Sequence, residues 1–177
     1  MDFKYKNILN FGALLSGSYI LYSILVYLLN INIFGIIYAP ISLLLTLVLI
    51  FVFLLIGTKK YRNIGSEGYI NYSKAFVHSI LIGIFASIVI GIFNFIFYEI
   101  VGPEYLLGHI NKLMATLEQT GNIPTEKLDE TYQKLLSEAE LPAYRQGIKT
   151  IIFWIITSGF ISLIIGAIVK KTKPLFD

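Results

Sequence analysis

Three polar residues in the long apolar stretches of this sequence are candidates for chemistry. His78 and Glu99 lie near the two ends of one apolar stretch, and Asn94 lies deeper within it. Ionisable groups placed inside a membrane are often functional. Near the end of a span, however, such a side chain reaches the hydrated interface. We therefore expect His78 and Glu99 to be interfacial residues.

Catalysis requires partner groups that the sequence does not place beside these residues. The chain contains no cysteine and only two histidines. No second histidine or carboxylate stands three or four positions from His78, so the spacing of a helical metal site is absent. The sequence therefore predicts a protein that is not an enzyme and that holds no cofactor or metal. A membrane enzyme that acts on lipid through Glu99 or His78 is the weaker alternative.

Binding or permeation of a small molecule needs polar side chains near the middle of the membrane. The best candidates for this role are Ser16, Tyr19, Ser23 and Asn94. We expect Asn94 to hydrogen-bond to a serine, a tyrosine or a backbone group on a neighbouring span, and the tyrosines of the first apolar stretch are suitable partners. Such a bond contributes about 0.6–2 kcal/mol. Trp154 is expected to lie in the aromatic belt at the interface.

The elements that would position these residues are membrane-spanning helices. Hydrophobic residues make up 56% and charged residues 14% of the 177 residues, and the mean hydropathy is +0.74. Soluble domains average about 25% charged residues. Four stretches, at about residues 8–29, 35–56, 76–100 and 150–169, are long and apolar enough to cross a bilayer. The predicted fold is all-α: one membrane domain over residues 1–177, a four-transmembrane-helix bundle in the lipid bilayer.

The basic residues indicate the orientation of this bundle, because lysine and arginine concentrate in cytoplasmic loops. Nine of them lie in the two termini and in the loop between the second and third spans: Lys4, Lys6, Lys59, Lys60, Arg62, Lys74, Lys170, Lys171 and Lys173. The turn at residues 30–33 has none. Both termini are therefore predicted to be cytoplasmic. The net charge of +3 is too small to indicate a nucleic-acid partner.

The connection between the third and fourth spans, residues 101–148, has a helical pattern of its own. Gly102 and Pro103 interrupt the third span, and apolar residues then recur at helical spacing. Gly121 is placed to end this first helix, and Thr125 is the predicted N-cap of a second amphipathic helix. We predict an extracytoplasmic αα-hairpin. Its apolar stripes either cover each other, or lie against the outer leaflet or a partner.

Small residues four positions apart allow membrane helices to approach closely. The third span carries Gly83, Ser87 and Gly91, and the fourth carries Ser158, Ser162 and Gly166. The first span carries Gly12 with Ser16, and Ala13 with Gly17. We therefore expect spans one, three and four to make the tight contacts, and span two to face lipid along most of its length. A homodimer through the same ridge is the alternative to packing within one chain.

Several local motifs occur in an order that is shared with a known family. Tyr61-Arg62-Asn63, Gly68-Tyr69-Ile70 and Ser73-Lys74-Ala75-Phe76 precede the glycine-rich third span, which leads to Phe97-Tyr98 and Pro103-Glu104-Tyr105. Gly159, Ile161-Ser162-Leu163-Ile164, Lys170-Lys171 and Pro174 follow. Over most of its length the chain resembles the small four-span membrane proteins of Bacteroidota catalogued as domain of unknown function 4199. The resemblance implies a bacterial inner-membrane protein with an external helical hairpin, and it implies no activity and no site residues.

Two functional hypotheses remain after these observations. The leading one is a non-enzymatic accessory, scaffold or envelope-interaction protein that recognises a protein partner through the external hairpin. This hairpin is the one water-facing element that the sequence predicts to be structured. The alternative is a subunit of an oligomeric permeation pathway for a small molecule or an ion. Polar residues that line one face near the middle of the membrane would favour this alternative.

Overall fold

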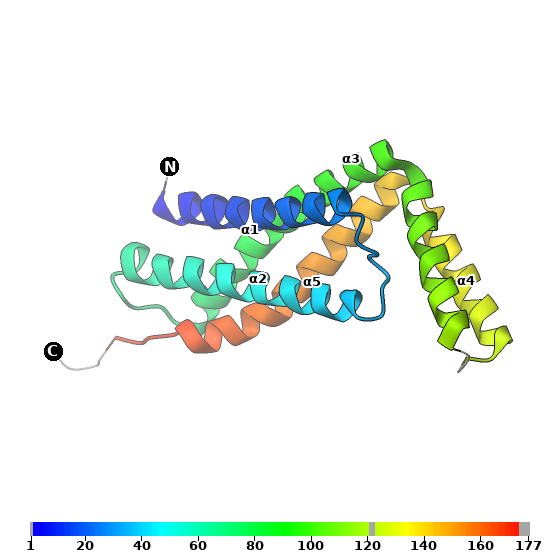
Figure 1. The fold of residues 1–177 in the computed structure, drawn as a ribbon. Coiled ribbons are helices and arrows are strands. Elements are labelled where there is room, and N and C mark those ends of the chain that lie inside the picture. Colours follow the sequence, from blue (N-terminus) through cyan, green and yellow to red (C-terminus); the bar gives the residue numbers. More distant parts are fainter. Residues whose placement is uncertain (1, 121–122, 174–177) are drawn as a thin grey trace.

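The computed structural model describes residues 2–120 and 123–173, and most of them are helical (Figure 1). The four long helices are α1 (Phe3–Leu28), α2 (Tyr38–Lys60), α3 (Tyr72–Thr120) and α5 (Ala143–Val169). All four are long and apolar enough to cross a membrane. The shorter α4 (Thr125–Ala139) precedes α5, and a π-helical turn, η1 (Tyr61–Gly65), extends α2. The all-α fold and the four candidate membrane helices are thus confirmed.

The two ends of the bundle differ in composition. Both termini and the loop between α2 and α3 lie at one end, whereas the hairpin and the loop between α1 and α2 lie at the other (Figure 1). At the first end, Ile70 and Lys171 form an antiparallel bridge, with N–O distances of 2.9 and 2.8 Å. The nine basic residues named above therefore belong to one end, which is called here the basic end.

Helices α3 and α5 form the closest pair, and small residues make this possible. The six predicted packing residues, Gly83, Ser87, Gly91, Ser158, Ser162 and Gly166, are all buried. A Cβ atom on Gly83 would lie 2.4 Å from the Cβ of Ser158. Ser162 Oγ donates a hydrogen bond to Ser79 Oγ at 2.9 Å. The ridge of α3 is therefore occupied by α5 of the same chain.

The other two helices pack less tightly. On α1, a Cβ atom on Gly12 would lie 2.5 Å from Phe85 Cδ1, so this part of the helix lies close to α3. Ala13 and Gly17 are exposed, and a Cβ atom on Gly17 would have no atom of another element within 4 Å among the described residues. Helix α2 exposes a long aliphatic face, in which Leu44 is 62% and Ile41 57% exposed. This face fits the expectation that span two meets lipid along most of its length.

Apolar side chains form a core cluster in the half of the bundle near the basic end, which also buries polar side chains of serine, threonine, asparagine and histidine. Leu15, Ile50, Leu54, Ile82 and Ala86 come from three helices, and all have no exposed surface. They form one cluster together with Ile90, Trp154 and Ile165. This half of the membrane domain is therefore a packed core.

Helix α3 leaves the bundle at a sharp kink. Gly102 has φ +68° and ψ 174°, a backbone conformation that residues with a Cβ atom rarely adopt. Pro103 follows it and cannot donate a backbone hydrogen bond to the preceding turn. Beyond the kink, α3 and α4 run side by side as the predicted hairpin (Figure 1).

The apolar stripes of the hairpin bury against each other. Leu106, Ile110 and Met114 of α3 form a cluster with Leu128 and Ala139 of α4. Ile33 and Phe34, from the loop between α1 and α2, pack against the same cluster. The stripes are thus covered by the chain itself, and the hairpin is seated on the end of the bundle.

One predicted cap is wrong. Thr125 is the first residue of α4, and Pro124 occupies the N-cap position with φ −57° and ψ 141°. The proline ring fixes φ near the value that the N-cap position adopts here. Pro124 therefore takes that position, and the helix begins one residue later, at Thr125. Glu126 lies in the first turn, where a carboxylate favours the helix dipole. Gly121, predicted to end the first hairpin helix, lies outside the described residues.

Candidate functional site

A cavity of about 460 Å³ lies in the half of the membrane domain that faces the hairpin. It is enclosed by the second half of α1, the first half of α2, the end of the membrane part of α3, and the start of α5. Its polar lining consists of five tyrosines, four small hydroxyl residues, an amide and a lysine: Tyr19, Tyr22, Tyr38, Tyr98, Tyr105, Ser23, Ser42, Thr46, Thr150, Asn94 and Lys149. Among the described residues, no carboxylate and no histidine lines this cavity.

Hydroxyl groups of α1 and α2 form a chain along one wall. Tyr22 on α1 donates a hydrogen bond to Ser42 Oγ on α2 at 2.8 Å. Its oxygen also pairs with the hydroxyl of Tyr38, at the first residue of α2. Because a tyrosine has one O–H, Tyr38 must donate to Tyr22 when Tyr22 donates to Ser42. This wall offers a polarised hydroxyl surface in an otherwise apolar region.

Asn94 stands on the opposite wall and bonds to α5. Its Nδ2 donates to Thr150 Oγ1 at 2.9 Å, and Thr150 Oγ1 in turn donates to the backbone oxygen of Gln146 at 3.0 Å. The prediction that Asn94 bonds to a neighbouring span is confirmed, but its partner is a threonine of the fourth span. The side-chain oxygen of Asn94 provides a hydrogen-bond acceptor on the lining of the cavity.

Aromatic rings close the inner end of the cavity. Trp154 is 1% exposed, and its ring meets that of Tyr19 edge to face at 4.8 Å. The expectation that Trp154 lies in an interfacial belt is therefore wrong. Trp154 lies four residues after Thr150, the predicted start of the fourth span, but its ring packs into the buried apolar cluster of the bundle.

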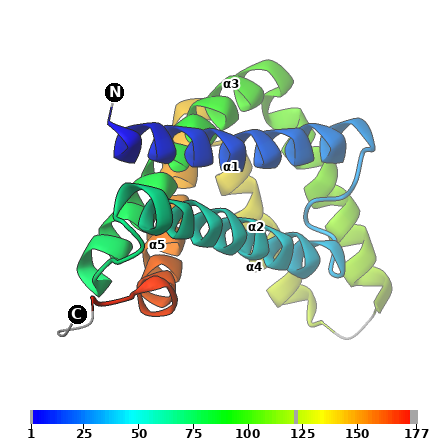
Figure 2. The same cartoon turned by 90° about the vertical axis from the view of Figure 1, so that its left-hand side faces the viewer.

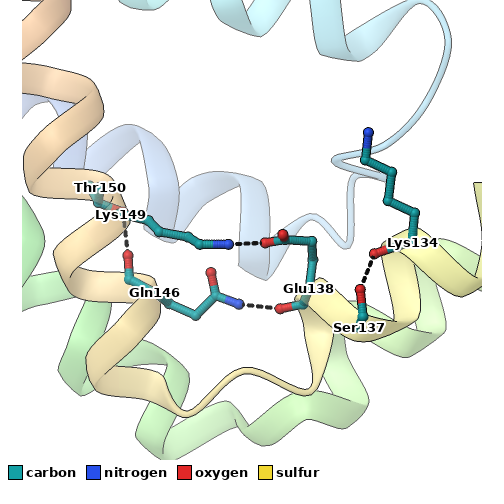
Figure 3. Close-up of polar contacts among 6 residues, drawn as sticks. All are labelled: Lys134, Ser137, Glu138, Gln146, Lys149 and Thr150. Atoms are coloured by element: carbon teal, nitrogen blue, oxygen red, sulfur yellow. Dashed lines mark hydrogen bonds and ion pairs between the residues drawn. The ribbon is translucent and has the colours of Figure 1, made fainter.

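The hairpin is tied to the rim of the cavity by polar contacts that Figure 3 shows. Lys149 Nζ on α5 forms an ion pair with Glu138 on α4. Gln146 Nε2 donates to the backbone oxygen of Glu138 at 2.6 Å. Lys149 also lines the cavity. Its ammonium group is therefore a positive charge at the cavity that is already paired with a carboxylate.

The residues that the sequence singled out for permeation come together only in part. Tyr19, Ser23 and Asn94 line the cavity, whereas Ser16 does not. Ser16 is buried, and its hydroxyl donates to the backbone oxygen of Ala13 at 3.2 Å. Sequence reasoning missed Tyr38, Ser42 and Thr150, although each of these polar residues interrupts an apolar run and could have been found by that signal.

The structure buries His78, for which an interfacial position is predicted, inside the bundle. Its side chain is 1% exposed, and its Nε2 pairs with Asn7 Oδ1 at 2.8 Å. The ring of Tyr61 stacks on it at 3.9 Å between centroids. The π-helical turn brings Tyr61 over this position and thereby covers the imidazole. This cluster lies near the basic end, in the half of the bundle opposite to the cavity.

Glu99 is exposed, as expected for an interfacial residue. It borders a smaller cavity of about 250 Å³ beneath the hairpin, together with Tyr98, Pro103 and Gln146. Within the described residues, no group of three or more metal-binding side chains occurs.

The hairpin contains a buried histidine outside the membrane-spanning part of α3. His109 is 2% exposed, its ring meets that of Tyr105 at 4.6 Å, and burial and the nearby Lys112 lower its pKa. The unfolded hairpin therefore binds more protons than the folded one below about pH 6.5, and folding weakens as pH falls. We expect the protection factors of the amides in residues 103–120 and 125–139, which correct for the slower intrinsic exchange at low pH, to fall between pH 7.5 and 5.5, and His109→Gln to abolish that fall. An equal fall in the variant would contradict this assignment.

Comparison with known proteins connects this architecture to a family. A family model described as a protein of unknown function, DUF4199, matches residues 10–171. The match runs from α1 to the segment after α5, and so includes the cavity, the hairpin and six of the nine basic residues of the basic end. No curated protein and no solved structure matches the chain. The chain therefore belongs to the DUF4199 family, as the order of its motifs implied.

Proposed function

We propose that this protein binds a small uncharged molecule in the cavity between α1, α2, α3 and α5. The observation that carries the proposal is a cavity of about 460 Å³ whose walls present hydroxyl and amide groups inside an apolar bundle. Polar side chains are costly at such positions and are commonly retained for function. The volume falls within the range of about 300–1,000 Å³ that is usual for ligand pockets.

The chemistry of the walls defines the class of ligand. Tyrosine rings provide flat apolar surfaces, while their hydroxyls and Asn94 offer hydrogen bonds. A free cation would find no carboxylate among the described residues of the lining, and Lys149 is neutralised by Glu138. The cavity therefore suits an uncharged ring that carries hydroxyl or carbonyl groups.

Binding of a ligand in this cavity is better supported than permeation through a single copy of the protein. The polar cavity ends at Trp154 and Tyr19, and beyond them fully buried aliphatic residues such as Leu15 and Ile50 pack together with buried serines and threonines. A permeation pathway would need further copies or a rearrangement of these helices. The binding proposal does not depend on either.

The single tryptophan allows a direct test of this proposal. In nanodiscs, 4-nitrobenzyl alcohol is expected to quench Trp154 fluorescence saturably, because the probe is an uncharged ring with one hydroxyl. Ser23→Leu, which adds bulk to the cavity wall, should remove the saturable part. Gly17→Leu on the exposed face of the same helix should leave it unchanged. The charged 4-nitrobenzoate should not quench saturably.

The outcome that would refute the binding proposal is specific. Quenching that rises linearly with the probe, or that is identical in wild type and Ser23→Leu, indicates partition into lipid without a site. Quenching by 4-nitrotoluene as strong as that by the alcohol would show that the hydroxyl-lined wall makes no contribution.

We also propose that the protein lies in a bacterial inner membrane with both termini in the cytoplasm. The nine basic residues at one end support this orientation. The chain has no cysteine, so single cysteines report on the two ends. In spheroplasts, a membrane-impermeant maleimide should label Thr131→Cys on α4, and it should label Ser73→Cys only after lysis. The reverse pattern would invert the orientation.

Protein recognition by the hairpin is the second candidate function. The exposed face of α4 carries Glu126, Asp129 and Glu130, and none of these forms an ion pair within the described residues. Because the apolar stripes are covered, a partner would be recognised by charge. Lysine substitutions at these three acids should then remove proteins that copurify from native membranes. An unchanged set of proteins would exclude this function.

A further inference from the structure

A second large cavity, of about 500 Å³, lies at the basic end, between the α2–α3 loop and the segment after α5. Among the described residues, its lining includes Lys74, Lys171 and Lys173 but only one carboxylate, Glu67. Three positive charges and one negative charge leave a net charge of +2 on these side chains. We infer that this cavity binds the phosphate of an anionic phospholipid headgroup.

The backbone around this cavity is fixed by specific contacts. Ile70 and Lys171 exchange two backbone hydrogen bonds, at 2.9 and 2.8 Å. Arg62 donates from Nη1 to the backbone oxygen of Val169 at 3.2 Å. Viewed from the basic end, the segment after α5 lies beside the start of α3 (Figure 2). The lysines are therefore gathered around one cavity by the fold.

Two of the cationic groups of this cavity lie near one tyrosine ring, and the lysines are incompletely neutralised. The ammonium groups of Lys171 and Lys173 lie 5.3 and 5.8 Å from the centre of the Tyr69 ring. Lys173 also lies 3.6 Å from Glu67, whereas Lys74 and Lys171 form no ion pair within the described residues. The like charges that line this cavity repel one another, and a bound phosphate would relieve that repulsion.

The surroundings favour a lipid as the source of the phosphate. Exposed apolar residues adjoin the cavity residues in sequence: Ile64 is 61%, Ile168 49% and Val77 42% exposed. These side chains would meet acyl chains, while the lysines meet the headgroup. Basic pockets between membrane helices on the cytoplasmic side commonly hold anionic headgroups. This location depends on the orientation proposed above, although the binding site itself does not.

The test measures lipid binding to the whole protein in an uncharged detergent. Dioleoyl phosphatidylglycerol is expected to raise the thermal unfolding midpoint, whereas dioleoyl phosphatidylcholine is not. Lys171→Gln with Lys173→Gln should weaken phosphatidylglycerol binding at least about tenfold, because each lysine near a membrane surface contributes about a factor of five. Lys127→Gln with Lys134→Gln on α4 removes the same charge at the opposite end and should leave binding unchanged.

Three further arms make the result decisive. Lys171→Arg with Lys173→Arg keeps the charges and should retain binding. Lys74→Gln alone tests the site if the double glutamine variant does not fold. Equal binding in the two double glutamine variants, or equal effects of the two lipids, would overturn the inference. Stabilisation by inorganic phosphate as strong as by phosphatidylglycerol would assign the site to the free anion and overturn the lipid assignment.

Discussion

Gly147→Ala is expected to lower the thermal unfolding midpoint in detergent by about 3–10 °C, the shift that corresponds to about 1–3 kcal/mol of overpacking in a chain of this size. A Cβ atom at this position would lie 2.8 Å from the backbone oxygen of Gly91 and 3.1 Å from the Cβ of Phe95. A backbone oxygen cannot rotate away as the tip of a long side chain can. Helices α3 and α5 would therefore have to separate.

Gly91 on α3 is the counterpart of Gly147, and a substitution there tests the same contact between α3 and α5. A Cβ atom on Gly91 would lie 2.2 Å from Ile151 Cγ1 and 3.0 Å from the backbone oxygen of Gly147. Gly91→Ala should therefore be destabilising as well, and Gly91→Leu and Gly83→Leu should reduce the folded yield.

Gly17→Ala is the matched control for the glycine substitutions. Gly17 also lies within a membrane helix, but a Cβ atom added to it would have no atom of a neighbouring element within 4 Å among the described residues. Because alanine favours the helix by up to about 1 kcal/mol over glycine, this variant should be neutral or slightly stabilised. If all three alanine variants unfold at the wild-type temperature, the close approach of α3 and α5 is refuted.

Trp154→Ala is expected to cost about 3–5 kcal/mol, the usual loss when a large buried aromatic side chain is removed from a packed core. Trp154 is the largest of the fully buried side chains, and it separates the polar cavity from the aliphatic core. Its removal takes away the edge-to-face contact with Tyr19 and joins empty space to the cavity. Unfolding in denaturing detergent, followed by circular dichroism, measures the loss.

Phe160→Ala provides the comparison for the tryptophan substitution. Phe160 lies on the same helix and is 68% exposed, so lipid surrounds it whether or not the helices are packed. We expect a change within about 0.5 kcal/mol, as is usual for exposed sites. Equal losses in the two variants would mean that Trp154 also faces lipid, and that the inner wall of the cavity is assigned wrongly.

Much of the architecture could be predicted because hydrophobicity acts locally. A run of about 20 apolar residues satisfies its own backbone hydrogen bonds as a helix, wherever its neighbours lie. Glycines and serines four positions apart share one helix face by geometry alone, which is why Gly83, Ser87 and Gly91 could be assigned to one ridge. The kink at Gly102 and Pro103 was predictable for the same reason, since it depends on the conformations open to two residues.

The candidate site could be predicted only in part, because helix rotation and crossing decide which faces meet. Asn94 was identified as a polar residue in a span, yet its partner Thr150 lies on the fourth span and not on the first. Gly147 lies outside the predicted fourth span, and only its contact with the Gly91 backbone oxygen reveals its role. His78 became a buried residue because Tyr61 and Asn7 cover it from two other elements.

Residue types and their spacing were enough to predict four apolar helices, the positions where small residues permit close contact, and the gathering of positive charge at one end. These properties depend on residue type and spacing along a single helix. The tertiary structure alone decided that tyrosines and serines of α1 and α2 face Asn94 and Thr150 across a cavity. It also decided that Lys171 meets the α2–α3 loop. Such contacts depend on the relative rotation and crossing of helices, which no local pattern encodes.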